Sequence, residues 1–311
     1  MLKRLGIKVE SDDRPVESPP LAAATVVLLR DAPDGMEIFM VERHGLSDVL
    51  GGVHVFPGGK VDSADAAADV LQRLDAPLDA LHGVLGEPDL ETSTAAGVFI
   101  AACRETFEEA GILLAEGAGA QHVAEAKKRA GAGVAFGDII AQLGLRLDWS
   151  NVVPWSRWIT PLLPREMKKP RDPRFLLDIT KRFDARFFLA AVPSDQVARH
   201  DDHEATESFW LRPRVVLERY WEARIKLAPV QIMSLVALAR HADVADALAA
   251  ARGRRPPMIQ PEPFIYEQQR AIAFPGSEWH PVDERVLAGP SFLVYRNKRF
   301  EPVGGFEAFF A

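Results

Sequence analysis

The stretch Arg104-Glu105-Thr106-Phe107-Glu108-Glu109-Ala110-Gly111 determines how this sequence is best interpreted. On a helix, residues three and four positions apart share a face, so the three glutamates project together. We expect this helix to begin after Thr94, a suitable N-cap residue, and to end at Gly111, which suits the C′ position. The spacing also predicts an apolar stripe on the opposite face, formed by Phe99, Cys103, Phe107 and Ala110.

The three glutamates predict a metal site. Clustered carboxylates repel one another unless a cation lies among them, and hard oxygen ligands suit Mg²⁺ or Mn²⁺. A solvated charged face explains a bare Glu-x-x-Glu-Glu more simply. The complete set of Arg104, three glutamates and Gly111 is expected by chance about once in several million positions, at roughly one in twenty per residue type. The upstream turn Phe56-Pro57-Gly58-Gly59 adds a place where backbone closely approaches another group.

These residues resemble the Nudix box, Gly-x5-Glu-x7-Arg-Glu-U-x-Glu-Glu-x-Gly-U, in which U is a bulky apolar residue. Gly59 fits the opening glycine, and residues 104–112 fit the second half. Three departures stand out: Asp65 replaces a glutamate, Thr106 replaces an apolar residue, and an insertion at about residues 66–95 separates the halves. Because its side chain is shorter, Asp65 is not expected to be a metal ligand.

A box interrupted at this point resembles the branch of the superfamily that contains peroxisomal-type coenzyme A diphosphatase and its bacterial relatives. Residues 54–59, 158–161 and 182–188 are similar to the same branch. The resemblance implies a nucleoside diphosphate derivative as substrate and Mg²⁺ or Mn²⁺ as cofactor. It also implies that Arg104 orients a carboxylate, and that the metal ligands are Glu105, Glu108, Glu109 and the backbone carbonyl of Gly59.

The general base has candidates in two places. One is Glu105, and the other is the acidic segment 201–207, where the superfamily often supplies a carboxylate, here Glu204 or Glu207. A solvated loop explains that segment equally well, because exposed charge is common. Arginine matches phosphate geometry, so basic residues beside the motifs are candidates to bind the extra phosphate of coenzyme A. These substrate-binding candidates are Arg43, Lys60 and Arg157, although solvated surface charge is the default explanation for each of them.

The order of patterns predicts an α+β fold, a Nudix-type α/β/α sandwich with a mixed sheet. Residues 1–20 are an extended lead-in, 21–222 the Nudix domain, and 223–311 a C-terminal extension of helix and extended pieces. Short helices are expected in the insertion and one long helix over 228–252. Strands are expected at 24–30, 37–43, 53–56, 155–161 and 186–192.

Composition limits the classes of function. The 311 residues carry a net charge of −7, which disfavours a general nucleic-acid binder. The single cysteine, Cys103, excludes a disulfide framework and is expected to be a buried thiol. The eight histidines show no spacing typical of a metal site. Neither a signal peptide nor an apolar run of membrane length is evident, so we expect a cytoplasmic protein without a membrane partner.

Three functions stay open at this level. The first is hydrolysis of coenzyme A or acyl-coenzyme A at its diphosphate. The second keeps this chemistry but acts on ADP-ribose, a nucleotide sugar or a dinucleotide. The third is a Nudix module that senses a nucleotide without cutting it, which the three intact glutamates disfavour. Residues 223–311 are further candidates for a homodimer interface.

Overall fold

The protein is built around a mixed sheet whose central strand is β1 (Leu21–Ala32). The computed structural model describes residues 19–44, 52–74, 76–162, 182–200 and 205–311. Strand β1 is apolar almost throughout because both of its faces are covered. It runs parallel to β6 (Phe183–Ala191) and antiparallel to β2 (Gly35–Arg43). The predicted mixed sheet is therefore confirmed.

The sheet extends outward from these three strands. Beyond β6 lie β5 (Val153–Ile159) and then β8 (Met258–Ile259), which pairs in parallel with β5. Strand β2 has β7 (Ala205–Leu211) along one edge and β3 (His54–Val55) near the end of the other. Residues 205–207 are thus strand rather than the acidic loop that the sequence indicated.

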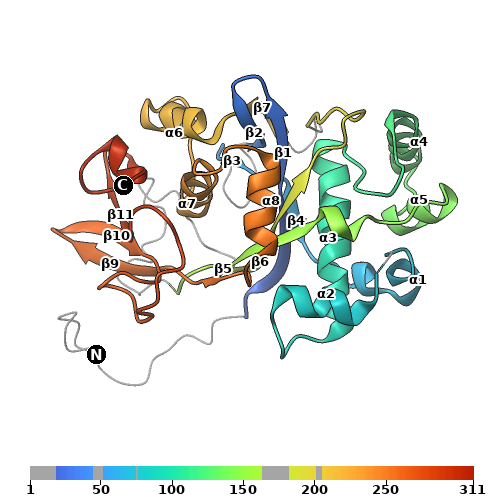
Figure 1. The fold of residues 1–311 in the computed structure, drawn as a ribbon, viewed down its shortest axis with the longest axis horizontal. Helices are drawn as coiled ribbons and strands as arrows, with labels where there is room; N and C mark the ends of the chain where they lie inside the picture. Colours follow the sequence, from blue (N-terminus) through green and yellow to red (C-terminus); the bar gives the residue numbers. More distant parts are fainter. Residues whose placement is uncertain (1–18, 45–51, 75, 163–181, 201–204) are drawn as a thin grey trace.

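Helices cover both faces of the sheet, as Figure 1 shows. One face packs against α3 (Thr92–Ala110), with Val26 and Leu28 of β1 in the shared core. The other face packs against α6 (Pro213–Trp221), α7 (Pro229–Leu238) and α8 (Val244–Arg252), with Val27 and Leu29 in that core. Alternate residues of one strand therefore belong to different layers, as the strand period of two requires.

The glycine turn lies where β1 changes partners. Strand β2 pairs with β1 at residues 29–32, whereas β4 (Gly58–Lys60) pairs with the same edge at residues 23–25. Between the two, the Val26 amide donates to the Pro57 carbonyl at 2.8 Å. The turn is thereby held at the sheet edge, on a strand that also packs against α3.

The insertion and the box helix differ from expectation only in their boundaries. The insertion contains the predicted short helices, α1 (Ala68–Leu71) and α2 (Leu78–Leu85), after a 3-10 turn at Ser63–Ala66. Helix α3 begins at Thr92 with Glu91 as its N-cap, so the predicted N-cap Thr94 lies inside the helix. Two further helices, α4 (Ala120–Gly131) and α5 (Phe136–Gln142), and a 3-10 turn at Trp149–Asn151 precede β5.

The predicted single helix over 228–252 is wrong, because the chain breaks between α7 and α8. The Asp243 carboxylate accepts a hydrogen bond from the Asp246 amide at 2.8 Å and so caps a new helix. No helix in the described part of the chain is long and apolar enough to cross a membrane.

The C-terminal residues form a second sheet of four antiparallel strands, followed by a 3-10 turn at Phe306–Phe309. Because β8 joins the main sheet and α7 and α8 cover one of its faces, the residues after 222 are packed on the main fold. The division at residue 222 stays a prediction. The strands of this second sheet are β9 (Glu262–Tyr266), β10 (Gln269–Ala273), β11 (Phe292–Arg296) and β12 (Arg299–Glu301).

Candidate active site

Arg104 is the centre of an ion-pair network at the start of the box sequence. Its Nε and Nη2 atoms donate to the two oxygens of Asp65, each at 2.9 Å. Its Nη1 atom donates to Glu105 at 2.7 Å and to Glu108 at 3.0 Å. Nη2 also reaches the Lys60 carbonyl at 2.9 Å. The Arg104 guanidinium therefore connects the strand after the glycine turn with Asp65 and with two of the predicted metal ligands, Glu105 and Glu108.

Electrostatics keep this arginine charged. Burial alone would lower the pKa of Arg104, but its hydrogen bonds to Asp65 and the charges of Glu105 and Asp65 outweigh burial and raise the pKa above its usual value. Asp65 is 3% exposed, and both of its carboxylate oxygens accept hydrogen bonds from Arg104. That Asp65 is not a metal ligand stays a prediction.

The glycine turn and the glutamates of α3 are in direct contact. The Gly58 amide donates to Glu109 Oε2 at 2.8 Å. A Cβ atom at Gly59 would collide with the Glu105 carboxylate, so only glycine permits this approach. The side chain of Glu105 is 12% exposed and that of Glu108 is 46% exposed. The solvent exposure of the glutamates therefore increases from the buried Glu109 to the exposed Glu108.

The chemistry of these side chains suits a hard divalent cation. Glu105, Glu108 and Glu109 are carboxylates on one helix, and the space that a side chain at Gly59 would fill is instead taken by the Glu105 carboxylate. Oxygen donors of this kind are the ligands that Mg²⁺ and Mn²⁺ prefer.

The predicted substrate-binding residues lie in different places. Lys60 is exposed and follows the glycine turn, and Arg43 ends β2 with its backbone bonded to Val53 and Gly52. Arg157 lies on β5, where Asp184 accepts two hydrogen bonds of 2.7 Å from it. These bonds are the main reason why the pKa of Arg157 is raised.

Arg157 lines a cavity of about 460 Å³ on the α3 side of the sheet. Glu87, which follows helix α2 of the insertion, contacts both Arg157 at 2.8 Å and Arg186 at 2.6 Å. Asp184 contacts the same two arginines. The strand register places Gly59, Ala24, Arg186 and Arg157 in one row across four strands. At the usual strand spacing, Arg186 is two strands, or about 10 Å, from Gly59.

Sequence reasoning missed Glu87, Asp184 and Arg186. Asp184 and Arg186 alternate with Phe187 on β6 and so point to the same face, a strand-period signal that was available in the sequence. Nothing in the sequence indicated that Glu87 would pair with Arg157 and Arg186, which follow it by 70 and 99 positions.

The candidate bases do not lie together. Glu204 lies outside the described residues, and Glu105 contacts the glycine turn. Glu207 lies on β7, where the register places it opposite Glu42 of β2. On β2, Met40 alternates in step with Glu42 and packs toward α6 and α7, whereas Val41 packs toward α3. Glu207 therefore lies on the sheet face away from α3.

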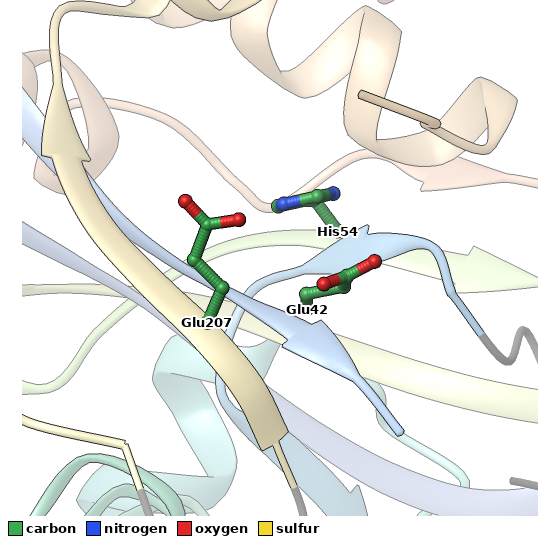
Figure 2. Close-up of side chains that lie close together, drawn as sticks. All are labelled: Glu42, His54 and Glu207. Atoms are coloured by element: carbon green, nitrogen blue, oxygen red, sulfur yellow. The ribbon is translucent and has the colours of Figure 1, made fainter. Parts of the chain in front are cut away.

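Glu207 forms part of a second polar cluster, with Glu42 and His54, shown in Figure 2. One ligand atom of each residue lies within 4.8 Å of one ligand atom of the other two. His54 is buried, and burial lowers its pKa against the opposing charges of Glu42 and Glu207, with Arg219 adding to the decrease. Histidine spacing in the sequence gave no sign of this cluster, because its members come from three separate strands.

Comparisons with known proteins place the chain in a family. The sequence model described as the NUDT19 Nudix domain matches residues 21–238. The chain is 28% identical to the acyl-coenzyme A diphosphatase NUDT19 of Gallus gallus over 272 residues, which covers 72% of this chain and 69% of that protein. Its identity to the Xenopus laevis protein of the same name is 23%, covering 85% and 77%.

A solved structure shows the same fold. The crystal structure of a Nudix hydrolase from Alicyclobacillus acidocaldarius superposes with a TM-score of 0.53, at 23% sequence identity. The match covers 77% of this chain and 98% of that one.

Proposed function

Because this chain belongs to the NUDT19 Nudix domain family of diphosphohydrolases, we propose that it hydrolyses the diphosphate of coenzyme A or an acyl-coenzyme A. Water attacks one phosphorus atom, the phosphoanhydride bond breaks, and the products are an adenosine bisphosphate and a phosphopantetheine. The observation that carries the proposal is the contact of Glu105 and Glu109 with the glycine turn, organised by Arg104.

The proposed roles follow from these contacts. Glu105, Glu108 and Glu109 would hold Mg²⁺ or Mn²⁺ together with the Gly59 carbonyl. When bound, such an ion neutralises the diphosphate and acidifies nearby water. Arg104 fixes the rotamers of Glu105 and Glu108, so the carboxylates need no reorganisation during the reaction. Glu105, next to the turn, accepts the proton of the attacking water, whereas Glu207 has no part in this step because it faces away from α3.

The cavity at Arg157 is the proposed site for the adenosine-side phosphate that other nucleoside diphosphates lack. It lies on the same face as α3, and both Arg157 and Arg186 reach into its lining. Glu87 and Asp184 already balance these two charges. A phosphate must therefore compete with Glu87 for the guanidiniums, which makes binding sensitive to the position of the insertion.

The proposed reaction is tested by following product release from coenzyme A, acyl-coenzyme A, ADP-ribose, NADH and nucleotide sugars. Each is assayed with Mg²⁺, with Mn²⁺ and with chelator, using the wild type and Glu108→Gln. We expect metal-dependent cleavage of the coenzyme A compounds, and a loss of at least a hundredfold in the variant. If ADP-ribose or a nucleotide sugar is cleaved in preference, that compound is the substrate instead of coenzyme A. Tight binding without cleavage would indicate a sensor.

The phosphate site has its own test. Arg157→Met should raise KM for coenzyme A severalfold and leave KM for dephospho-coenzyme A, which lacks that phosphate, unchanged. Arg252→Met, at an exposed position on α8, is the matched control. Equal effects on both substrates would show that Arg157 acts only through folding.

The assignment of the base is tested separately. Glu105→Gln should lower kcat by about 10²–10⁴ even at saturating Mg²⁺, with little change in Tm. Recovery of turnover at high Mg²⁺ would show that the variant lost only its part in holding the ion. Glu204→Gln is assayed beside it, and wild-type turnover in that variant would leave Glu105 as the base.

A further inference from the structure

We propose that Glu42, His54 and Glu207 form a second metal site, which binds a divalent first-row transition metal such as Zn²⁺. This site is on the sheet face opposite α3. It is separate from the glutamates of the proposed active site, and it does not depend on the proposed reaction.

The strand register assembles the three ligands. Glu42 on β2 is directly opposite His54 on β3 and directly opposite Glu207 on β7. Side chains of directly paired residues lie on the same face of a sheet, close enough to contact one another. Figure 2 shows the three side chains on one side of their strands, with the Glu207 carboxylate toward the His54 ring. This row is a consequence of sheet geometry and not of loop placement.

His54 is the observation that indicates a ligand. It is 3% exposed, yet within the described chain neither ring nitrogen has a hydrogen-bond partner. Buried polar side chains are nearly always hydrogen-bonded, and an unmade bond leaves the cost of desolvation uncompensated. The ring packs against Phe209 with centroids 5.3 Å apart. A metal ion between the ring and the two carboxylates would supply a partner for one of the two ring nitrogens.

Two neighbouring contacts fix the ligands before any ion binds. The Thr206 hydroxyl donates to Glu42 Oε2 at 2.7 Å, which orients that carboxylate. The His54 amide donates to the Lys226 carbonyl at 2.9 Å, which anchors β3 beside the start of α7. The hydrogen bond to Glu42 is of the kind that orients ligating carboxylates in metal sites. Glu207 is exposed, so an ion can enter from solvent.

The donor set selects the class of ion. One imidazole nitrogen with two carboxylates suits Zn²⁺ and its neighbours, whereas Mg²⁺ prefers oxygen ligands alone. Three protein ligands leave one position of a tetrahedral ion for water. The Arg219 guanidinium lies 5.6 Å from the Phe209 ring and its charge acts on His54. This cation opposes metal binding, so its removal should strengthen the site.

The test uses the full chain carrying Glu105→Gln and Glu108→Gln, which weakens ion binding at α3. Zn²⁺ affinity is measured by calorimetry, and Co²⁺ is added as a spectroscopic probe. We expect one Zn²⁺ per chain and a strong visible Co²⁺ band typical of four or five ligands. His54→Gln and Glu207→Gln should each weaken Zn²⁺ at least tenfold, and Arg219→Gln should strengthen it.

His241→Gln is the matched control, because His241 pairs with a single carboxylate, Asp246, on α8. It should bind Zn²⁺ as the parent does. Unchanged Zn²⁺ affinity in both His54→Gln and Glu207→Gln would overturn the proposal, as would a Co²⁺ spectrum of weak octahedral type. If His54→Gln does not fold, Glu207→Gln decides the question, since its side chain is exposed.

Discussion

Asp65 and Arg104, 39 positions apart in the sequence, are joined by two hydrogen bonds of 2.9 Å each. The insertion lies between them in the sequence, and their pairing brings the two halves of the interrupted box together in space. Asp65 Oδ2 also accepts the Asp62 amide at 2.8 Å, so the same carboxylate stabilises the turn that leads into the insertion.

The first prediction concerns this pair. Asp65→Asn leaves the arginine without its buried counter-charge and should cost about 3 kcal/mol in the free energy of unfolding. Since Arg104 then no longer fixes Glu105, kcat should fall roughly 10–100-fold. Urea denaturation and steady-state kinetics measure the two effects. Asp62→Asn, whose side chain is 66% exposed and 3.7 Å from Arg104, should change stability by less than about 0.5 kcal/mol. Equal losses in both variants would contradict the prediction.

The glycine turn gives a second prediction. Gly59→Ala places a methyl group against the Glu105 carboxylate and should abolish most activity while Tm changes little. Gly83→Ala is the control, because Gly83 lies in α2 and an added Cβ there would meet nothing within 4 Å. There the alanine should stabilise the protein by about 0.5–1 kcal/mol. Activity of Gly59→Ala close to wild type would show that Glu105 does not need its present position.

A third prediction tests the contact between the insertion and the sheet. Glu87→Gln removes the carboxylate shared by Arg157 and the buried Arg186, and should destabilise the fold by about 2–3 kcal/mol. Proteolysis should then cut the insertion faster than in the wild type. Asp89→Asn lines the same cavity and serves as the comparison, with near-wild-type stability expected.

Cys103 provides a fourth prediction. Burial, with added repulsion from Asp148 and Asp65, raises the pKa of this thiol to about 12. Thiol reagents require the thiolate, so the folded protein should not react at pH 8. The rate of labelling, followed by absorbance, should equal the rate of global unfolding, whereas Ala130→Cys on the exposed surface of α4 should react at once. Rapid labelling of Cys103 in the native protein would mean that α3 opens locally.

The box helix was predictable because its signal is contiguous. Helical spacing alone places Glu105, Glu108 and Glu109 on one helix, and Gly111, with a φ of 65°, ends that helix as expected. The break at Asp243 was missed although an aspartate three residues before Asp246 is a capping signal, since the apolar pattern continues across it.

Contacts that depend on strand register could not be predicted from the sequence. His54 and Glu207 each pair with Glu42 only because β3 and β7 lie on either side of β2, and no sequence pattern specifies that order. Strand β7 itself was hidden by its acidic start, since charged residues on an outer strand resemble a solvated loop. The Glu87 pairing depends likewise on how the insertion folds back onto β5 and β6.

The ion pair between Asp65 and Arg104 has a consequence for variation in the insertion. This bridge joins Asp65, just before the insertion, to Arg104, on the helix that follows it, so we expect changes of length in the insertion to leave the glutamates of α3 in place. The insertion nevertheless contributes Glu87 to the cavity wall. We therefore expect sequence changes in the insertion to alter binding in this cavity, while the proposed metal ligands of α3 keep their positions.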